Sequence, residues 1–229
     1  ETSGMTQHTQ WQRNGAPIAK ATGPTYALGV SDVGAQVSVR VTVSKSGFTS
    51  AVSQSAPTSA IKHVRDVRKT VNYRIATRGK TSTSQDSFSK EVNQILNDPR
   101  GWRSDGIAFK EVKSGGSMTI YLANPKSVRS FSTACSAKWS CRVGRNVVIN
   151  QDRWKYSTAT WKKAKGTSLS GYRHMVINHE VGHWLGRGHS KCKGKGKTAP
   201  IMMQQSKGLK GCKPNPWPLK SELNPPRFR

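Results

Sequence analysis

Three histidines and one glutamate fall within an eleven-residue segment, at a spacing that suits metal chemistry. His179 and His183 are four residues apart. On a helix this spacing puts both imidazoles on one face, where they can bind one ion. Glu180 follows the first histidine, so it lies beside such an ion without having to bind it. A general base for a metal-activated water is needed at that position.

Two glycines allow a third histidine to reach the same ion. Gly186 tolerates a positive φ, so the helix can end there and the chain can turn back. Gly188 adds further freedom, and His189 can then approach the ion from the loop. Three neutral histidines leave the fourth position of a zinc ion open for water, as in catalytic sites. Three of the six histidines of the chain lie in this segment, which disfavours the alternative that they are ordinary surface residues.

The whole pattern His-Glu-x-x-His-x-x-Gly-x-x-His, from His179 to His189, resembles the metzincin clan of zinc peptidases at every fixed position. The resemblance implies that the three histidines bind zinc and that Glu180 is the general base. It implies an α+β domain with a mixed twisted sheet, two main helices, one of which carries the site, and an irregular C-terminal subdomain. Ser190 is similar to the matrixin ending, whereas the chain as a whole is closer to secreted bacterial metzincin-like domains with a basic, disulfide-closed tail.

Metzincins also place a methionine in a tight turn beneath the zinc, and the segment Ala199–Gln204 resembles that turn. The resemblance favours Met202 over Met203, since an aliphatic residue usually precedes the methionine. Both could instead be ordinary core residues, because methionine fills irregular gaps. No tyrosine follows the turn, so the group that stabilises the oxyanion stays open. The specificity pocket is expected in the tail between Met203 and Pro218.

Apolar patterns before the tail predict the elements that position the site. Period-two alternation predicts strands, and apolar spacing of three and four predicts helices. The expected strands cover residues 71–75, 107–112, 118–122 and 147–149, and the expected helices cover 84–96 and 170–185. By resemblance to the clan, the strand Met118–Leu122 is expected to be the sheet edge that aligns an extended substrate.

Residues 1–57 are predicted to form a separate, all-β module. Asn14-Gly15 is a hairpin signal, and valines alternate with polar residues from Val37 to Val43. The segment Asp32–Val39 resembles the corner of immunoglobulin-like sandwiches, with valines in place of the usual tyrosine and cysteine. A full sandwich needs about 100 residues. We therefore expect a partial Ig-like module, followed by the metallopeptidase domain over residues 58–229.

Four cysteines predict disulfides, an oxidising compartment and hence secretion. Pairing Cys135 with Cys141 and Cys192 with Cys212 is favoured among the three possible pairings, because each bond closes a local loop. No Cys-x-x-Cys pattern indicates a structural zinc site.

The chain is strongly basic, with 38 lysines and arginines against 11 aspartates and glutamates and a net charge of +27. Such a field attracts polyanions, for example an anionic cell-surface polymer, although a solvated basic coat is equally consistent with it. The run Lys191–Lys197 could place charge at the mouth of the site and select acidic substrates. No specific nucleic-acid binding, no membrane span and no oligomeric state is indicated.

The sequence therefore predicts a secreted zinc-dependent endopeptidase that cleaves protein or peptide substrates with a zinc-activated water and Glu180 as general base. The alternatives are a zinc amide hydrolase acting on cell-wall peptides and a non-catalytic, polyanion-binding zinc protein. The intact Glu180 argues against the latter, since an inactive relative would often lose the base. Asp105 is interpreted as a turn residue, and His174 as a capping or surface residue.

Overall fold

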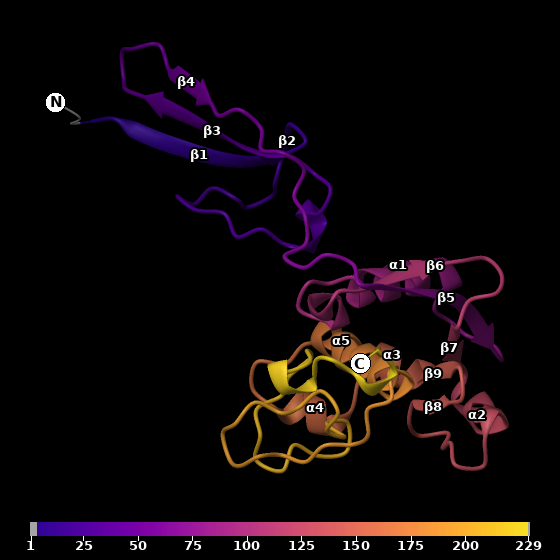
Figure 1. Cartoon of the computed structure of the whole chain (residues 1–229). Coiled ribbons are helices and arrows are strands. Elements are labelled where there is room, and N and C mark those ends of the chain that lie inside the picture. Colours follow the sequence, from indigo (N-terminus) through magenta and orange to yellow (C-terminus); the bar gives the residue numbers. More distant parts are fainter. Residues whose placement is uncertain (1–3, 229) are drawn as a thin grey trace. The chain divides into compact units, whose positions relative to one another are not determined.

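The computed structural model describes residues 4–228 and divides into two compact units, Glu1–Val64 and Arg65–Arg229 (Figure 1). The division lies a few residues after the expected boundary at residues 57 and 58. Each unit has its own sheet.

The first unit is built on one antiparallel sheet in the order β2-β1-β3-β4. Its elements are β1 (Thr6–Arg13), β2 (Ala16–Pro17), the 3-10 turn η1 (Val30–Asp32), β3 (Val37–Ser44) and β4 (Ala51–Gln54). Asn14 and Gly15 both have positive φ, which confirms the predicted hairpin turn. The Asp32 carboxylate is fully buried and pairs with Arg13 at 2.7 Å. One sheet is present among the described residues of this unit, and the Ig-like assignment stays a prediction.

The second unit contains a mixed five-stranded sheet in the order β6-β5-β7-β9-β8. Its strands are β5 (Lys69–Arg78), β6 (Ile107–Glu111), β7 (Met118–Ala123), β8 (Cys141–Val143) and β9 (Asn146–Asn150). The four strands expected from the sequence are all present, and they pair in parallel. Strand β8 was not expected; it pairs antiparallel with β9.

The expectation that Met118–Leu122 forms the sheet edge is wrong. Strand β7 lies between β5 and β9, and its register pairs Ile120 with both Ile75 and Val147. This central position suits the strand, because five of its six residues are buried and four of these five are apolar. The edge strand on that side is β8, which has a hydrogen-bonded neighbour on one side only.

Two long helices, α1 and α5, pack with the sheet around one core, as the sequence predicted. The helices are α1 (Gln85–Leu96), α2 (Pro125–Val128), α3 (Gln151–Tyr156), α4 (Ala159–Lys163) and α5 (Leu169–Trp184). The 3-10 turns of this unit are η2 (Trp102–Asp105), η3 (Arg129–Phe131), η4 (Lys220–Glu222) and η5 (Pro226–Phe228). Ser84 and Ser168 cap α1 and α5 by accepting hydrogen bonds from backbone amides of the first turn. The arrangement fits the expected α+β class.

Helix α5 runs through the core and therefore carries polar residues into buried surroundings. Ten of its sixteen residues are buried, among them His179 and Glu180. A helix buried over so much of its surface cannot place all its polar groups in water. After α5, the chain forms only two short 3-10 turns, η4 and η5, among its described residues, which confirms the irregular tail.

Gly182 lets the tail approach α5 closely. A Cβ at this position would clash with the Sδ of Met202 and would lie 3.0 Å from the ring of Trp102. Met202 itself is 1% exposed and belongs to the same core as Val181. Only a residue without a side chain allows this contact between the helix and the turn.

Gly182→Ala is expected to destabilise the protein by about 1–3 kcal/mol, because the added methyl group overpacks the contact with Met202. Gly171→Ala is the matched control on the same helix, since a Cβ there would lie no closer than 3.3 Å to its nearest neighbour, the Ser168 hydroxyl. That change should be neutral or stabilising by up to about 1 kcal/mol. Urea unfolding of both variants measures the difference, and equal stability would contradict the account.

Candidate metal centre

Three imidazoles converge at the end of α5. The Nε2 atom of His183 lies 3.2 Å from Nε2 of His179 and 3.1 Å from Nε2 of His189. The three residues form a group that can hold a metal ion, with ligand atoms all within 4.8 Å of one another. Three nitrogens bound to one tetrahedral zinc at its usual bond length would be about 3.3 Å apart. The spacing therefore fits a shared ion.

Two of these rings donate a hydrogen bond from Nδ1, the nitrogen that points away from the cluster, to a backbone carbonyl. His179 Nδ1 donates to the carbonyl of Ile201 at 2.8 Å, and His183 Nδ1 donates to that of Arg187 at 2.8 Å. With the proton held on Nδ1, each Nε2 carries a lone pair directed at its neighbours. Lone pairs this close repel one another unless a cation lies between them. This second hydrogen bond is the usual support of metal-binding histidines.

The turn after α5 brings His189 to the other two rings. Gly186 has a φ of +91°, as the sequence predicted for the point where the helix ends. The amide of Arg187 then donates to the carbonyl of Gly182. Beyond the third histidine, Ser190 N donates to Met202 O at 3.0 Å, which ties this loop to the turn below. The predicted return of the chain is thus fixed by backbone hydrogen bonds.

Burial keeps the histidines neutral, which is the state that binds metal. It lowers the pKa of His179 to about 3 and also lowers the pKa of His183. The pKa of His189, the most exposed of the three, moves in the same direction. Burial raises the pKa of Glu180 to about 8, against the positive charges of Arg142 and Lys207. A bound dication would also lower the pKa of this carboxyl group, as those two cations do.

The three histidines and Glu180 line an open cavity of about 360 Å³. The rest of its lining comes from α5, from residues 134–142 around β8, and from residues 204–207 after the turn that contains Met202. The tail therefore supplies only part of the expected specificity pocket. Among the described residues, no fourth histidine, cysteine or carboxylate joins the group. The cavity lies against one side of the histidine cluster.

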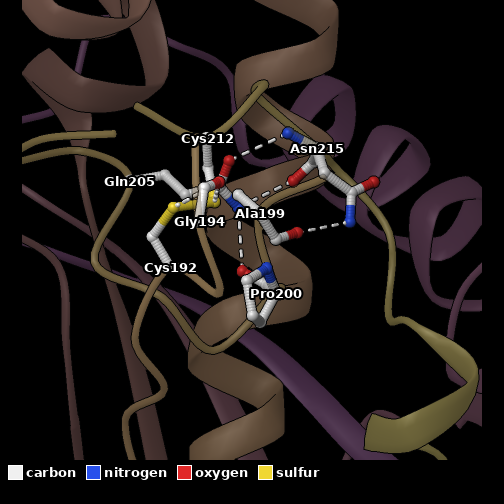
Figure 2. Close-up of a disulfide and its surroundings, with 7 residues drawn as sticks. All are labelled: Cys192, Gly194, Ala199, Pro200, Gln205, Cys212 and Asn215. Carbon is white, nitrogen blue, oxygen red and sulfur yellow. Dashed lines mark hydrogen bonds between the residues drawn. A yellow bond between two sulfur atoms is a disulfide. The ribbon is translucent and has the colours of Figure 1, made fainter. Parts of the chain in front are cut away.

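Both predicted disulfides, Cys135–Cys141 and Cys192–Cys212, are present. The first closes the loop that leads into β8 and lines the cavity. The second holds the two ends of the loop that contains the turn beneath the histidines (Figure 2).

Two buried amide side chains complete the support of that turn, as Figure 2 shows. Asn215 Nδ2 donates to the carbonyl of Ala199 at 2.8 Å, and Asn215 N donates to Gln205 Oε1 at 2.9 Å. Gln205 Nε2 donates back to the carbonyl of Pro200 at 3.3 Å. These bonds replace a regular sheet or helix in a segment that has neither.

A third support, Glu222, was not found by the sequence analysis. Its carboxylate is buried and accepts hydrogen bonds from the amides of Ile201 at 2.8 Å and Met202 at 2.9 Å. It also accepts one from Leu219 N at 2.9 Å. Because the Ile201 carbonyl accepts from His179, Glu222 orients a histidine of the cluster through one peptide group. A signal was available, since Glu180 and Glu222 are the only acidic residues after Asp152.

The residues that the sequence analysis set aside lie away from the cluster. His174 packs on Trp217, with ring centroids 4.8 Å apart, and is not part of the histidine group. Asp105 does not line the cavity and ends the 3-10 turn η2, so it is a turn residue as predicted. It is also buried and accepts hydrogen bonds from Arg68 and from Asn224 N. Among the tryptophans, Trp154, Trp161 and Trp184 belong to the core, whereas Trp139 lines the cavity.

Comparison with known families gives a match over most of the chain. The family described as a protein of unknown function, DUF3152, matches residues 39–213, well over half of the chain. The chain therefore belongs to the DUF3152 family. The matched region includes the histidine cluster, Glu180 and both disulfides. No curated protein matches the sequence.

Glu222→Gln is expected to weaken Zn²⁺ binding by about tenfold or more, because an amide cannot accept all three backbone hydrogen bonds and the Ile201 carbonyl then loses its fixed orientation. Competition with a chromophoric chelator measures the affinity, and circular dichroism reports folding. Glu111→Gln, on an exposed residue of β6 outside the cavity, is the matched control. A folded Glu222→Gln variant with wild-type zinc affinity would show that Glu222 plays no part in the metal centre.

Proposed function

We propose that this chain is a secreted, zinc-dependent endopeptidase of the metzincin type. In this proposal His179, His183 and His189 bind the zinc, and Glu180 is the general base. The observation that carries it is the convergence of three histidine Nε2 atoms at the edge of a cavity that Glu180 also lines. No other group of metal-binding side chains is found among residues 4–228.

The donor set supports zinc and a catalytic use of it. Imidazole nitrogen is a good ligand for zinc, whereas magnesium and calcium prefer oxygen ligands. Three protein ligands with an open fourth position are typical of catalytic zinc. When bound, zinc lowers the pKa of a water molecule and polarises a carbonyl group. The open cavity beside the histidines gives room for both the water and the substrate.

In this proposal Glu180 moves protons. It follows a proposed ligand on α5 and lines the cavity, and its carboxylate accepts no hydrogen bond from another described residue, so its oxygens remain available. The carboxylate can accept a proton from water and later donate it to the leaving amine of the cleaved peptide. Burial supports this exchange, because it brings the pKa of a carboxyl group closer to neutral pH.

The edge of β8 is the proposed place for the substrate backbone. Cys141 and Arg142 of this strand line the cavity, and the strand pairs with β9 on one side only. An extended peptide can add to such an edge through main-chain hydrogen bonds, which suits an endopeptidase because these bonds require no free chain end.

Met202 is the proposed Met-turn residue. It packs against Gly182 of α5, one residue before His183, whereas Met203 belongs to a separate cluster with Ala199 and Cys212. The carbonyls on either side of it are also engaged with the site, since Ile201 O accepts from His179 and Met202 O from Ser190. These contacts support the choice of Met202 over Met203.

Secretion is proposed on the two disulfides, which persist in oxidising compartments. The net charge of +27 suits a protein that works beside an anionic cell-surface polymer. Among the described residues, no helix combines the length and the apolar character needed to cross a bilayer.

Glu180→Gln is expected to lower kcat/KM for a fluorogenic protein substrate by a factor of about 100 or more, because the amide cannot accept a proton. Its zinc content should stay at the wild-type level, since Glu180 is not a proposed ligand. Glu111→Gln makes the same change outside the cavity and should keep full activity. A fully active, zinc-loaded Glu180→Gln variant would remove this residue from the mechanism.

A chelator should abolish the hydrolysis by the wild-type protein, and added zinc should restore it. Cell-wall stem peptides tested beside casein separate an amide hydrolase of cell walls from a general endopeptidase. A zinc-loaded wild-type protein that cleaves none of these substrates would contradict the enzymatic proposal and favour a non-catalytic, polyanion-binding role.

A further inference from the structure

Two basic side chains line the same cavity as the histidine cluster. Arg142 lies on the edge strand β8, and Lys207 lies in the segment that follows the turn with Met202. Both are exposed. Both cations therefore influence the space where a substrate would react.

Neither cation forms an ion pair within the described part of the chain. The ion pairs of the described residues involve other arginines, namely Arg13, Arg68, Arg100 and Arg173. Lys207 Nζ instead lies 5.8 Å from the ring centroid of Trp139, which also lines the cavity. Glu180 is the only acidic residue in the lining. The cavity thus has a local excess of positive charge even before a metal dication is added.

This charge is distinct from the general basic coat of the protein. The run Lys191–Lys197, which the sequence analysis placed at the mouth of the site, contributes no residue to the lining of the cavity. Arg142 and Lys207 are the arginine and lysine residues that line the cavity, so they are the ones that a substrate in it would meet.

We infer that Arg142 and Lys207 bind a carboxylate of the substrate, so that the enzyme prefers peptides with an acidic residue close to the scissile bond. The inference rests on the proposed function and adds its substrate class. A guanidinium group can hold a carboxylate through two parallel hydrogen bonds, and the lysine adds a second positive charge. The free C-terminal carboxylate of a peptide could bind to the same two side chains. The test therefore distinguishes an acidic side chain from a free C-terminus.

The test uses quenched fluorescent peptides that are identical except for Glu, Gln or Lys at each position flanking the cleaved bond, each with a free or an amidated C-terminus. For the wild-type protein we expect kcat/KM about tenfold higher with Glu than with Gln, and lowest with Lys. The preference should persist in amidated peptides and decrease at high salt. A preference that follows the free C-terminus would assign the two cations to the chain end and overturn the side-chain assignment.

The variant Arg142→Gln/Lys207→Gln should lose the preference for Glu while it still cleaves the Gln peptide. Lys193→Gln/Lys197→Gln is the matched control, because it removes the same charge from the exposed run outside the cavity and should keep the preference. If both double variants lose it equally, the selection comes from net charge and the inference is wrong.

Binding to the zinc-loaded Glu180→Gln protein separates this inference from the proposed function. Fluorescence anisotropy should show tighter binding of the Glu peptide than of the Gln peptide, and Arg142→Gln/Lys207→Gln in the same background should remove the difference. Selective binding without cleavage by the wild-type protein would contradict the peptidase and leave the charge recognition standing. Cleavage by the wild-type protein with equal kcat/KM for Glu and Gln peptides would support the peptidase and contradict the charge recognition.

Discussion

The site depends on one electrostatic constraint, which is that three imidazole rings converge, with the Nε2 atom of His183 3.1–3.2 Å from the Nε2 atoms of His179 and His189. Hydrogen bonds from His179 and His183 to backbone carbonyls fix the protons on the opposite nitrogens. The Nε2 lone pairs of these two rings therefore repel each other at 3.2 Å, and no rotation of either ring relieves this repulsion without breaking its hydrogen bond. A shared cation does relieve it, and the tail of the protein is arranged so that the three rings stay in place.

The tail performs this task without regular secondary structure. Its apolar residues form only one small cluster of their own, which contains Ala199, Met203 and Cys212. The tail is therefore also held by the Cys192–Cys212 disulfide, by buried polar side chains and by contact with α5. Glu222 fixes the two amides of the turn, Asn215 and Gln205 fix the carbonyls before it, and Gly182 admits Met202 against the helix. Satisfied polar networks of this kind favour a single geometry.

The short-range features of this structure could be predicted from the sequence, because the periodicity and spacing of residues determine them. The histidine spacing, the stop at Gly186 and the long helices are short-range features, and both disulfides close short loops. Strand order is a long-range property, which is why β7 was wrongly placed at the edge and β8, only three residues long, was missed. Glu222 was missed for the same reason, since its partners lie about 20 residues away. Arg142 and Lys207 could not be told apart from the many other basic residues until the cavity placed them together.

The most direct measurement of the account is X-ray absorption spectroscopy at the zinc edge of the purified, zinc-loaded protein, together with its metal stoichiometry. We predict one zinc per chain, with three imidazole nitrogens and one further light atom at about 2.0–2.1 Å and no sulfur ligand. Replacement of His189 by alanine should remove one imidazole from the spectrum. A protein that binds no zinc, or binds it through cysteine sulfur, would contradict the assignment of His179, His183 and His189 as the ligands.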